Sequence, residues 1–170
     1  MKTLLVCLSL LLSLCLGPVS QAANGPITCA IQTYNGHYLS ALNGGGYATN
    51  PLVTSATSIG TWERFTLVDQ GFGSPITYGI QTYDGHYLTA NNAGGLIANV
   101  MRSNATQVLA WEQFKLVWAG NNYYAIQTSN GNYLTATGGG GHNFDTDPNP
   151  IHSDATKIGT WEMFRFICGI

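Results

Sequence analysis

Charged residues are scarce in this sequence. Its 170 residues include six Lys and Arg and eight Asp and Glu, so 8% of the chain is charged, against about 25% in ordinary soluble domains. Apart from Lys2, the basic residues are scattered singly or lie at equivalent positions of a repeat: Arg64, Arg102, Lys115, Lys157 and Arg165. Nucleic acids and anionic membranes are bound by clustered Lys and Arg. We therefore expect neither as a partner.

Long apolar runs are also lacking. The segment Leu4–Leu16 spans thirteen residues, whereas a helix that crosses a bilayer needs about 20. It follows Lys2 and precedes the small residues Ser20 and Ala22, a pattern typical of a secretory signal peptide. We predict a signal peptide at residues 1–22 and one secreted, extracellular domain at residues 23–170, which we expect to be a monomer that does not associate with a membrane.

Few cysteines remain once the predicted signal peptide is set aside. Cys7 and Cys15 lie within it, which leaves Cys29 and Cys168 near opposite ends of the domain. An even number of cysteines in an exported chain is typical of disulfide bonding. We therefore predict a Cys29–Cys168 bridge.

The sequence does contain a phrase that occurs three times. It reads IQTYNGHYLSA at 31–41, IQTYDGHYLTA at 80–90 and IQTSNGNYLTA at 126–136, and a second phrase, W-E-x-F, follows at 62, 111 and 161. The copies begin 49 and 46 residues apart, and the third copy has four more residues between the two phrases. These spacings define repeats at about 27–70, 76–119 and 122–170.

Each repeat shows the signals of four short strands. The turns Asn35-Gly36 and Asp84-Gly85 are strong hairpin signals, because a type I′ turn needs positive φ at both central residues. We expect the fourth strand to begin at Trp62, Trp111 or Trp161, which gives twelve strands and no helix. Propellers usually have four or more blades and solenoids have atypical end repeats, whereas closure removes exposed edges. We predict an all-β protein, a β-trefoil with pseudo-threefold symmetry.

The repeated pattern I-Q-T-x-[ND]-G-x-Y-L-[ST]-A followed by W-E-x-F resembles the fascin-like β-trefoil family, including secreted modules associated with bacterial polysaccharide-degrading enzymes. The resemblance covers residues 23–170. It implies a β-trefoil fold and two functions, binding of polysaccharide or binding of actin or another protein. Export and the shortage of Lys and Arg argue against a filament partner, since bundling an acidic polymer needs basic patches. We therefore expect a non-catalytic carbohydrate-binding protein.

The hairpin tips are the expected binding sites. Exposed polar residues that differ between repeats at a loop are better ligand contacts than residues that suit all repeats alike, although a merely solvated turn is the alternative. Neutral, hydroxyl-rich ligands are bound by Asn, Asp, His and Tyr side chains. The predicted carbohydrate-binding residues are Tyr34, Asn35 and His37 in the first repeat, Tyr83, Asp84 and His86 in the second, and Asn130 and Asn132 in the third, where Ser129 replaces the tyrosine.

The second phrase is expected to be structural. Its members are Trp62, Glu63 and Phe65, Trp111, Glu112 and Phe114, and Trp161, Glu162 and Phe164. An aromatic residue kept in every repeat usually closes the gap between repeats, although an indole could also stack on a sugar. The glutamates are expected to accept hydrogen bonds from a neighbouring turn.

Enzymatic activity and a cofactor are not expected. One Glu per repeat would lie far from its copies, whereas a glycosidase needs two carboxylates about 5–9.5 Å apart. The sequence has no G-x-S-x-G motif, no spare thiol and no His with an evident carboxylate partner inside a repeat.

The insertion in the third repeat invites a metal hypothesis. It holds His142, Asp145, Asp147, Asn149 and His152, but their spacing matches neither a calcium loop nor a common zinc pattern. We expect a loop stiffened by Pro148 and Pro150, and no metal.

Overall fold

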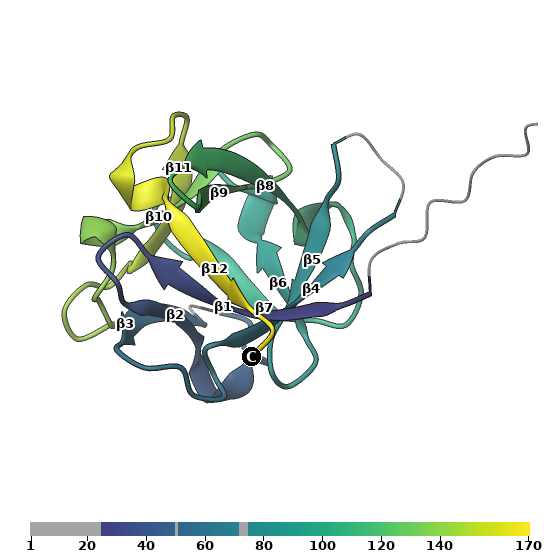
Figure 1. Ribbon diagram of the computed structural model, residues 1–170, viewed down its shortest axis with the longest axis horizontal. Helices are drawn as coiled ribbons and strands as arrows, with labels where there is room; N and C mark the ends of the chain where they lie inside the picture. Colours follow the sequence, from purple (N-terminus) through teal and green to yellow (C-terminus); the bar gives the residue numbers. More distant parts are fainter. Residues whose placement is uncertain (1–24, 50, 72–74) are drawn as a thin grey trace, which may run out of the picture.

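A computed structural model describes residues 25–49, 51–71 and 75–170 (Figure 1). The predicted signal peptide at 1–22 lies outside the described residues. The strands are β1 (Ile27–Thr33), β2 (Tyr38–Ala41), β3 (Leu52–Ala56), β4 (Arg64–Asp69), β5 (Tyr78–Gln81), β6 (Tyr87–Ala90), β7 (Met101–Ala105), β8 (Gln113–Gly120), β9 (Tyr123–Gln127), β10 (Tyr133–Ala136), β11 (Ile151–Ala155) and β12 (Phe164–Cys168).

Short 3-10 turns complete the described structure. In each repeat one 3-10 turn follows the second strand: η1 (Leu42–Gly44), η2 (Asn91–Ala93) and η4 (Thr137–Gly139). In the second and third repeats a further turn precedes the fourth strand: η3 (Ala110–Glu112) and η5 (Thr160–Glu162). The described ranges contain no α-helix, and none of their helical turns is long and apolar enough to cross a membrane.

Six strands close into an antiparallel barrel. The pairs run β1–β4, β4–β5, β5–β8, β8–β9, β9–β12 and β12–β1, so each barrel strand has two neighbours. The other six strands form the hairpins β2–β3, β6–β7 and β10–β11. In Figure 1 the first and last strands, β1 and β12, lie side by side. The predicted all-β, closed architecture is confirmed, and closure leaves no barrel edge unpaired.

The core repeats three times as the sequence does. Ile31, Ile80 and Ile126 on the first strands are 0% exposed, and the phenylalanines of the fourth strands, Phe65, Phe114 and Phe164, are at most 1% exposed. One difference from expectation concerns where the fourth strands begin. They begin two or three residues after each Trp, at Arg64, Gln113 and Phe164, because the W-E pair lies in a turn.

Neighbouring repeats are joined by a contact that we call the inter-repeat seam, in which the Gly-rich turn of one repeat packs on the next repeat. Gly46 N donates to Ser103 O at 2.8 Å, Gly95 N to Ser153 O at 2.7 Å, and Gly141 N to Thr54 O at 2.9 Å. The third bond joins the last repeat to the first. The seam is therefore cyclic.

Glycine is required inside this seam. Gly45, Gly94 and Gly140 have φ of 125°, 109° and 106°, a region that L side chains rarely adopt. A Cβ on each would also overlap the buried hydroxyl of a threonine in the adjoining repeat, namely Thr82, Thr128 and Thr33. The turns can approach the neighbouring repeat this closely only because they lack side chains.

We predict that Gly94→Ala destabilises the protein far more than Gly131→Ala. Both glycines have positive φ, 109° and 93°, but a Cβ at Gly131 has nothing within 4 Å whereas one at Gly94 meets Thr128 and Asn130. Gly131→Ala should cost about 1–2 kcal/mol for the left-handed backbone alone, and Gly94→Ala clearly more. Urea unfolding of the two variants measures the difference. If the two variants lose the same free energy of unfolding, the close approach of Gly94 to Thr128 does not contribute to stability.

The predicted disulfide is confirmed. Cys29 on β1 and Cys168 on β12 are directly opposite in the strand register and form the bridge. Their sequence separation is 139 residues, so the bridge encloses nearly the whole barrel and closes it at the same place as the β1–β12 pairing.

Reducing this bridge should lower the free energy of unfolding by about 4–5 kcal/mol, because the chain-entropy model assigns such a value to a loop of this size. Urea unfolding with and without reductant measures the change. A Cys29→Ser/Cys168→Ser variant serves as the control, since it should be insensitive to the reductant. Detection of two free thiols in the exported protein by mass spectrometry would contradict the prediction.

Candidate functional site

The hairpin tips are held by the same internal hydrogen bonds in all three repeats. The hydroxyl of Thr33 donates to Asn35 Oδ1 at 2.9 Å, that of Thr82 to Asp84 Oδ1 at 2.6 Å, and that of Thr128 to Asn130 Oδ1 at 2.8 Å. A glutamine at the end of each first strand donates to the turn glycine: Gln32 to Gly36 O, Gln81 to Gly85 O and Gln127 to Gly131 O. The tips are therefore rigid.

Each tip also docks on the Gly-rich turn of an adjoining repeat. Asn35 N donates to Gly139 O at 3.1 Å, Asp84 N to Gly44 O at 3.1 Å, and Asn130 N to Ala93 O at 3.2 Å. The side-chain amide of Asn35 donates to Gly140 O as well. Three of the predicted binding residues, Asn35, Asp84 and Asn130, thus hold the tips through their side chains and the seam through their backbone N–H groups, and Asn35 also bonds across the seam through its side chain.

The tyrosines of the tips point into solvent. Tyr34 is 46% exposed and Tyr83 is 64% exposed. The Tyr34 ring lies 5.6 Å from that of Tyr123, which in turn lies under the Arg165 guanidinium at 4.8 Å. Ser129, also exposed, occupies the equivalent place in the third repeat. The outward faces of the first two tips are aromatic, and that of the third is not.

The residues after the turns differ in their contacts. His37 Nδ1 lies 3.1 Å from Asn35 Oδ1, whereas Asn132 Nδ2 donates to Asp154 O at 3.0 Å. His86 Nδ1 lies 3.0 Å from Asp84 Oδ2. The expectation that no His has a carboxylate partner inside a repeat is therefore wrong for the second repeat, and also for the third, where His152 Nδ1 lies 3.9 Å from Asp154 Oδ1. The predicted type I′ turns are wrong as well, because Gly36 and Gly85 have positive φ whereas Asn35 and Asp84 do not.

The electrostatics of the second tip follow from this pair. Burial by itself would raise the pKa of Asp84, but the hydrogen bonds from Thr82 and from the backbone and ring of His86, together with the charge of His86, lower it below 3.8. The second tip therefore has a carboxylate, with a lowered pKa, at the position where the first and third tips have the neutral side chains of Asn35 and Asn130.

The three tryptophans are not buried, which corrects the expectation that they close the gaps between repeats. Trp62, Trp111 and Trp161 are 43%, 41% and 49% exposed. The reason lies in the turn before each fourth strand, where adjacent residues face opposite ways and the glutamate takes the inner position. Each repeat thus presents an indole to solvent.

The glutamates Glu63, Glu112 and Glu162 are buried with both carboxylate oxygens engaged. One oxygen accepts from the hydroxyl of Ser40, Thr89 or Thr135 on the second strand, at 2.7 Å for the two threonines. The other accepts from a backbone N–H three residues earlier, at Gly60, Leu109 or Gly159, over 2.7–2.9 Å. These carboxylates tie the second and fourth strands of a repeat together.

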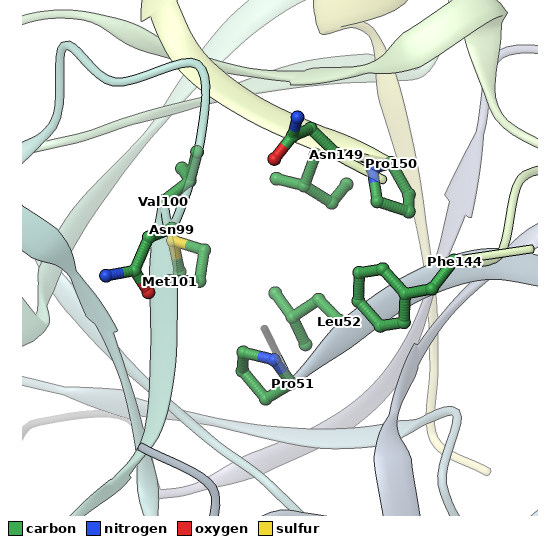
Figure 2. A pocket seen from close by; sticks show the side chains of 9 residues that line it. Pro51, Leu52, Asn99, Val100, Met101, Phe144, Asn149 and Pro150 are labelled. Atoms are coloured by element: carbon green, nitrogen blue, oxygen red, sulfur yellow. The ribbon is translucent and has the colours of Figure 1, made fainter. Parts of the chain in front are cut away.

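The insertion of the third repeat reaches the place where β3, β7 and β11 lie around one small pocket. Asn143 Oδ1 accepts from the backbone of Asp145 and Thr146 at 3.1 Å, which folds the loop on itself. Figure 2 shows Phe144 from this loop facing a pocket lined by Leu52, Met101 and Ile151 of the three repeats. The pocket measures about 20 Å³, room for about one water molecule.

Among the described residues, no three His, Cys, Asp or Glu side chains gather as metal ligands would. His142 and His152 of the insertion instead lie at places where the other repeats have Tyr47 and Leu96, or Val53 and Arg102.

A surface hollow that the sequence did not predict lies in the second repeat. It measures about 330 Å³, and its lining includes Asn91 and Asn92 of η2, Arg102 of β7 and Trp111 of η3. No local motif marks it, since Asn91 and Arg102 come from different elements. The available signal was that polar residues replace Leu42 and Val53 of the first repeat at equivalent positions.

Solved structures similar to this chain include β-trefoil proteins. A designed threefold-symmetric protein, ThreeFoil, is 17% identical with a TM-score of 0.68, over 82% of this chain and 97% of that one. The Rhizoctonia solani agglutinin is 17% identical with a TM-score of 0.61, over 89% and 99%. The Polyporus squamosus lectin, solved with the epitope Neu5Acα2-6Galβ1-4GlcNAc, is 12% identical with a TM-score of 0.63, over 85% and 50%.

No protein-family model and no curated protein matches the chain. At these identities the similarity establishes the fold, which is a β-trefoil, and leaves the function to be argued from the site.

The lowered pKa of Asp84 predicts a pH-dependent difference between the parent and the Asp84→Asn variant, which has the residue of the other two tips. An acid whose pKa is lower in the folded state stabilises the protein above its unfolded pKa, near 3.8, and this stabilisation is lost as the pH falls through the folded pKa. The parent should therefore lose stability relative to Asp84→Asn between about pH 5 and pH 3, measured by urea unfolding. If the difference in free energy of unfolding between the parent and Asp84→Asn does not change with pH, the pKa of Asp84 is not lowered in the folded protein.

Proposed function

We propose that this chain is a secreted, non-catalytic carbohydrate-binding protein of the fascin-like β-trefoil type, which binds polysaccharide through the tips of its first two repeats. The observation that carries the proposal is the exposure of Tyr34 and Tyr83 on rigid hairpins, 46% and 64%. A flat aromatic ring that is already ordered stacks on the apolar face of a pyranose at little entropic cost.

Within each tip the roles divide between positioning and contact. Asn35 and Asp84 hold the turn through their hydrogen bonds to Thr33 and Thr82. The tyrosine rings and the imidazoles of His37 and His86 are left to meet a sugar, the rings by stacking and the imidazoles by hydrogen bonds to hydroxyls. The third tip contributes less, because Ser129 offers no ring.

Fold and charge support the same proposal. Lectins occur among the structurally similar proteins, and one of them was solved with a sialylated trisaccharide. A chain that is only 8% charged is suited to hydroxyl-rich ligands, which are recognised by neutral hydrogen-bonding groups. Secretion rests on the signal peptide predicted at residues 1–22.

The absence of catalysis is proposed from the carboxylates of the W-E-x-F phrases. Glu63, Glu112 and Glu162 are at most 8% exposed, and both oxygens of each accept hydrogen bonds. A general acid or nucleophile must reach the glycosidic bond, whereas these groups face the interior.

Two tips on one rigid body favour polymeric over monomeric sugar. Once the first tip has bound, the second contact is intramolecular, which can raise the apparent affinity by about 10² or more.

The third repeat supplies the residue for the test. The double variant Tyr34→Ser/Tyr83→Ser gives the first two tips the serine found at Ser129, and it should be retarded much less than the parent in affinity electrophoresis with a panel of neutral polysaccharides. Ser129→Tyr, which adds a ring to the third tip, is the matched control and should not weaken retardation. Thermal unfolding checks that both variants are folded.

Retardation of the double variant equal to that of the parent would place binding elsewhere on the molecule. Release of reducing ends from any polysaccharide by the purified parent would contradict the non-catalytic part of the proposal.

A further inference from the structure

The lining of the hollow in the second repeat includes two residues with buried polar atoms that lack hydrogen-bond partners among the described residues. Asn91 is 9% exposed, and its amide group donates to Asn99 O while its Oδ1 has no hydrogen-bond partner among the described residues. Arg102 lies in the same hollow, and its Nε is also buried without a partner. Buried polar atoms in folded proteins are nearly always hydrogen-bonded. The two residues line one hollow, so a ligand bound there would lie beside a buried acceptor and a buried donor that have no partner in the described part of the chain.

The equivalent positions in the first repeat show that the scaffold does not need these groups. Leu42 stands in the place of Asn91, and Val53 in the place of Arg102, yet the strands and the 3-10 turns have the same arrangement there. The third repeat has Thr137 and His152. Only the second repeat combines an amide and a guanidinium at this place, so their presence calls for a reason outside the fold.

The third wall of the hollow is an indole. Trp111 is 41% exposed and lines the hollow together with Arg102 and Asn92. Its ring offers a flat apolar surface of the size of a pyranose. No acidic side chain belongs to the lining, so Arg102 brings a positive charge to the hollow that no carboxylate of the lining neutralises. An arginine presents paired N–H groups that match a carboxylate in two parallel hydrogen bonds.

We propose that this hollow is a subsite for an acidic pyranose, a uronate residue of a polysaccharide. The sugar ring stacks on Trp111, its carboxylate pairs with Arg102, and a ring hydroxyl donates to Asn91 Oδ1. The inference rests on the proposed carbohydrate-binding function and adds to it a ligand class and a second place on the molecule, separate from the tips. It predicts that uronate polymers are retained more strongly than neutral polymers of the same backbone.

The test uses matched ligands and matched variants. The ligands are polygalacturonate and alginate, each compared with its own carboxyl-reduced form, in affinity electrophoresis with the full protein. The variants Arg102→Val and Asn91→Leu introduce the residues of the first repeat. Trp111→Ala removes the stacking surface, and Trp62→Ala, which removes the exposed indole of the first repeat, is its control.

The parent should be retarded more by at least one uronate polymer than by its reduced form. Arg102→Val should weaken that uronate binding by about tenfold or more, the effect of losing a hydrogen bond to a charged partner, and should leave the binding of reduced polymer unchanged. Asn91→Leu and Trp111→Ala should weaken binding of both forms, while Trp62→Ala should not. Thermal unfolding establishes that each variant is folded.

Three results would overturn the subsite. They are equal retardation by a uronate polymer and its reduced form, uronate binding unaffected by Arg102→Val, and no retardation by either uronate polymer. The subsite and the proposed function can fail separately. If the parent binds neutral polysaccharides and Tyr34→Ser/Tyr83→Ser does not, the proposed function stands, even where one of these three results rejects the subsite. If no polysaccharide of either kind retards the parent, both fail.

Discussion

The packing of each hairpin tip on a glycine-rich turn of the adjoining repeat is the contact on which the rest of the structure depends. A single four-stranded repeat cannot bury its Ile, Leu and Phe side chains alone, so the core exists only when three repeats meet. The seam brings them together by backbone hydrogen bonds such as Asp84 N to Gly44 O, with no room for a Cβ at Gly45. Because the third seam joins the last repeat to the first, the Cys29–Cys168 bridge reinforces a closure that the tips already make.

The seam also decides which residues remain available for function. It occupies Thr33, Asn35 and their equivalents, which is why these residues recur in every repeat, and it leaves the tyrosines of the tips outside. Positions that the seam does not use are free to differ, and they do: Tyr34 corresponds to Ser129, and Val53 corresponds to Arg102. The residues of the repeated phrase that are the same in all three repeats thus form the scaffold, and the proposed sugar contacts of the tips lie at positions where the phrase differs between repeats.

The fold could be predicted from the sequence because each strand signal is local and occurs three times in register. The position of the tryptophans could not, because hydropathy favours Trp62 over Glu63 as the buried member of the pair. Burial of the glutamate instead depends on the Ser40 hydroxyl and the Gly60 N–H, which meet the carboxylate only after folding. The hollow is beyond local reasoning for a similar reason, since Asn91, Arg102 and Trp111 belong to three elements that the barrel brings together.

A threefold scaffold gives each functional difference an internal reference. In the first repeat the indole of Trp62 is as exposed as that of Trp111, but Leu42 and Val53 beside it can form no hydrogen bond through their side chains. An exposed indole alone therefore does not distinguish a site from a surface. Unpartnered Asn91 Oδ1 and Arg102 Nε make the distinction, because a buried polar atom without a partner is unfavourable in the folded state unless something outside the chain supplies the missing bond.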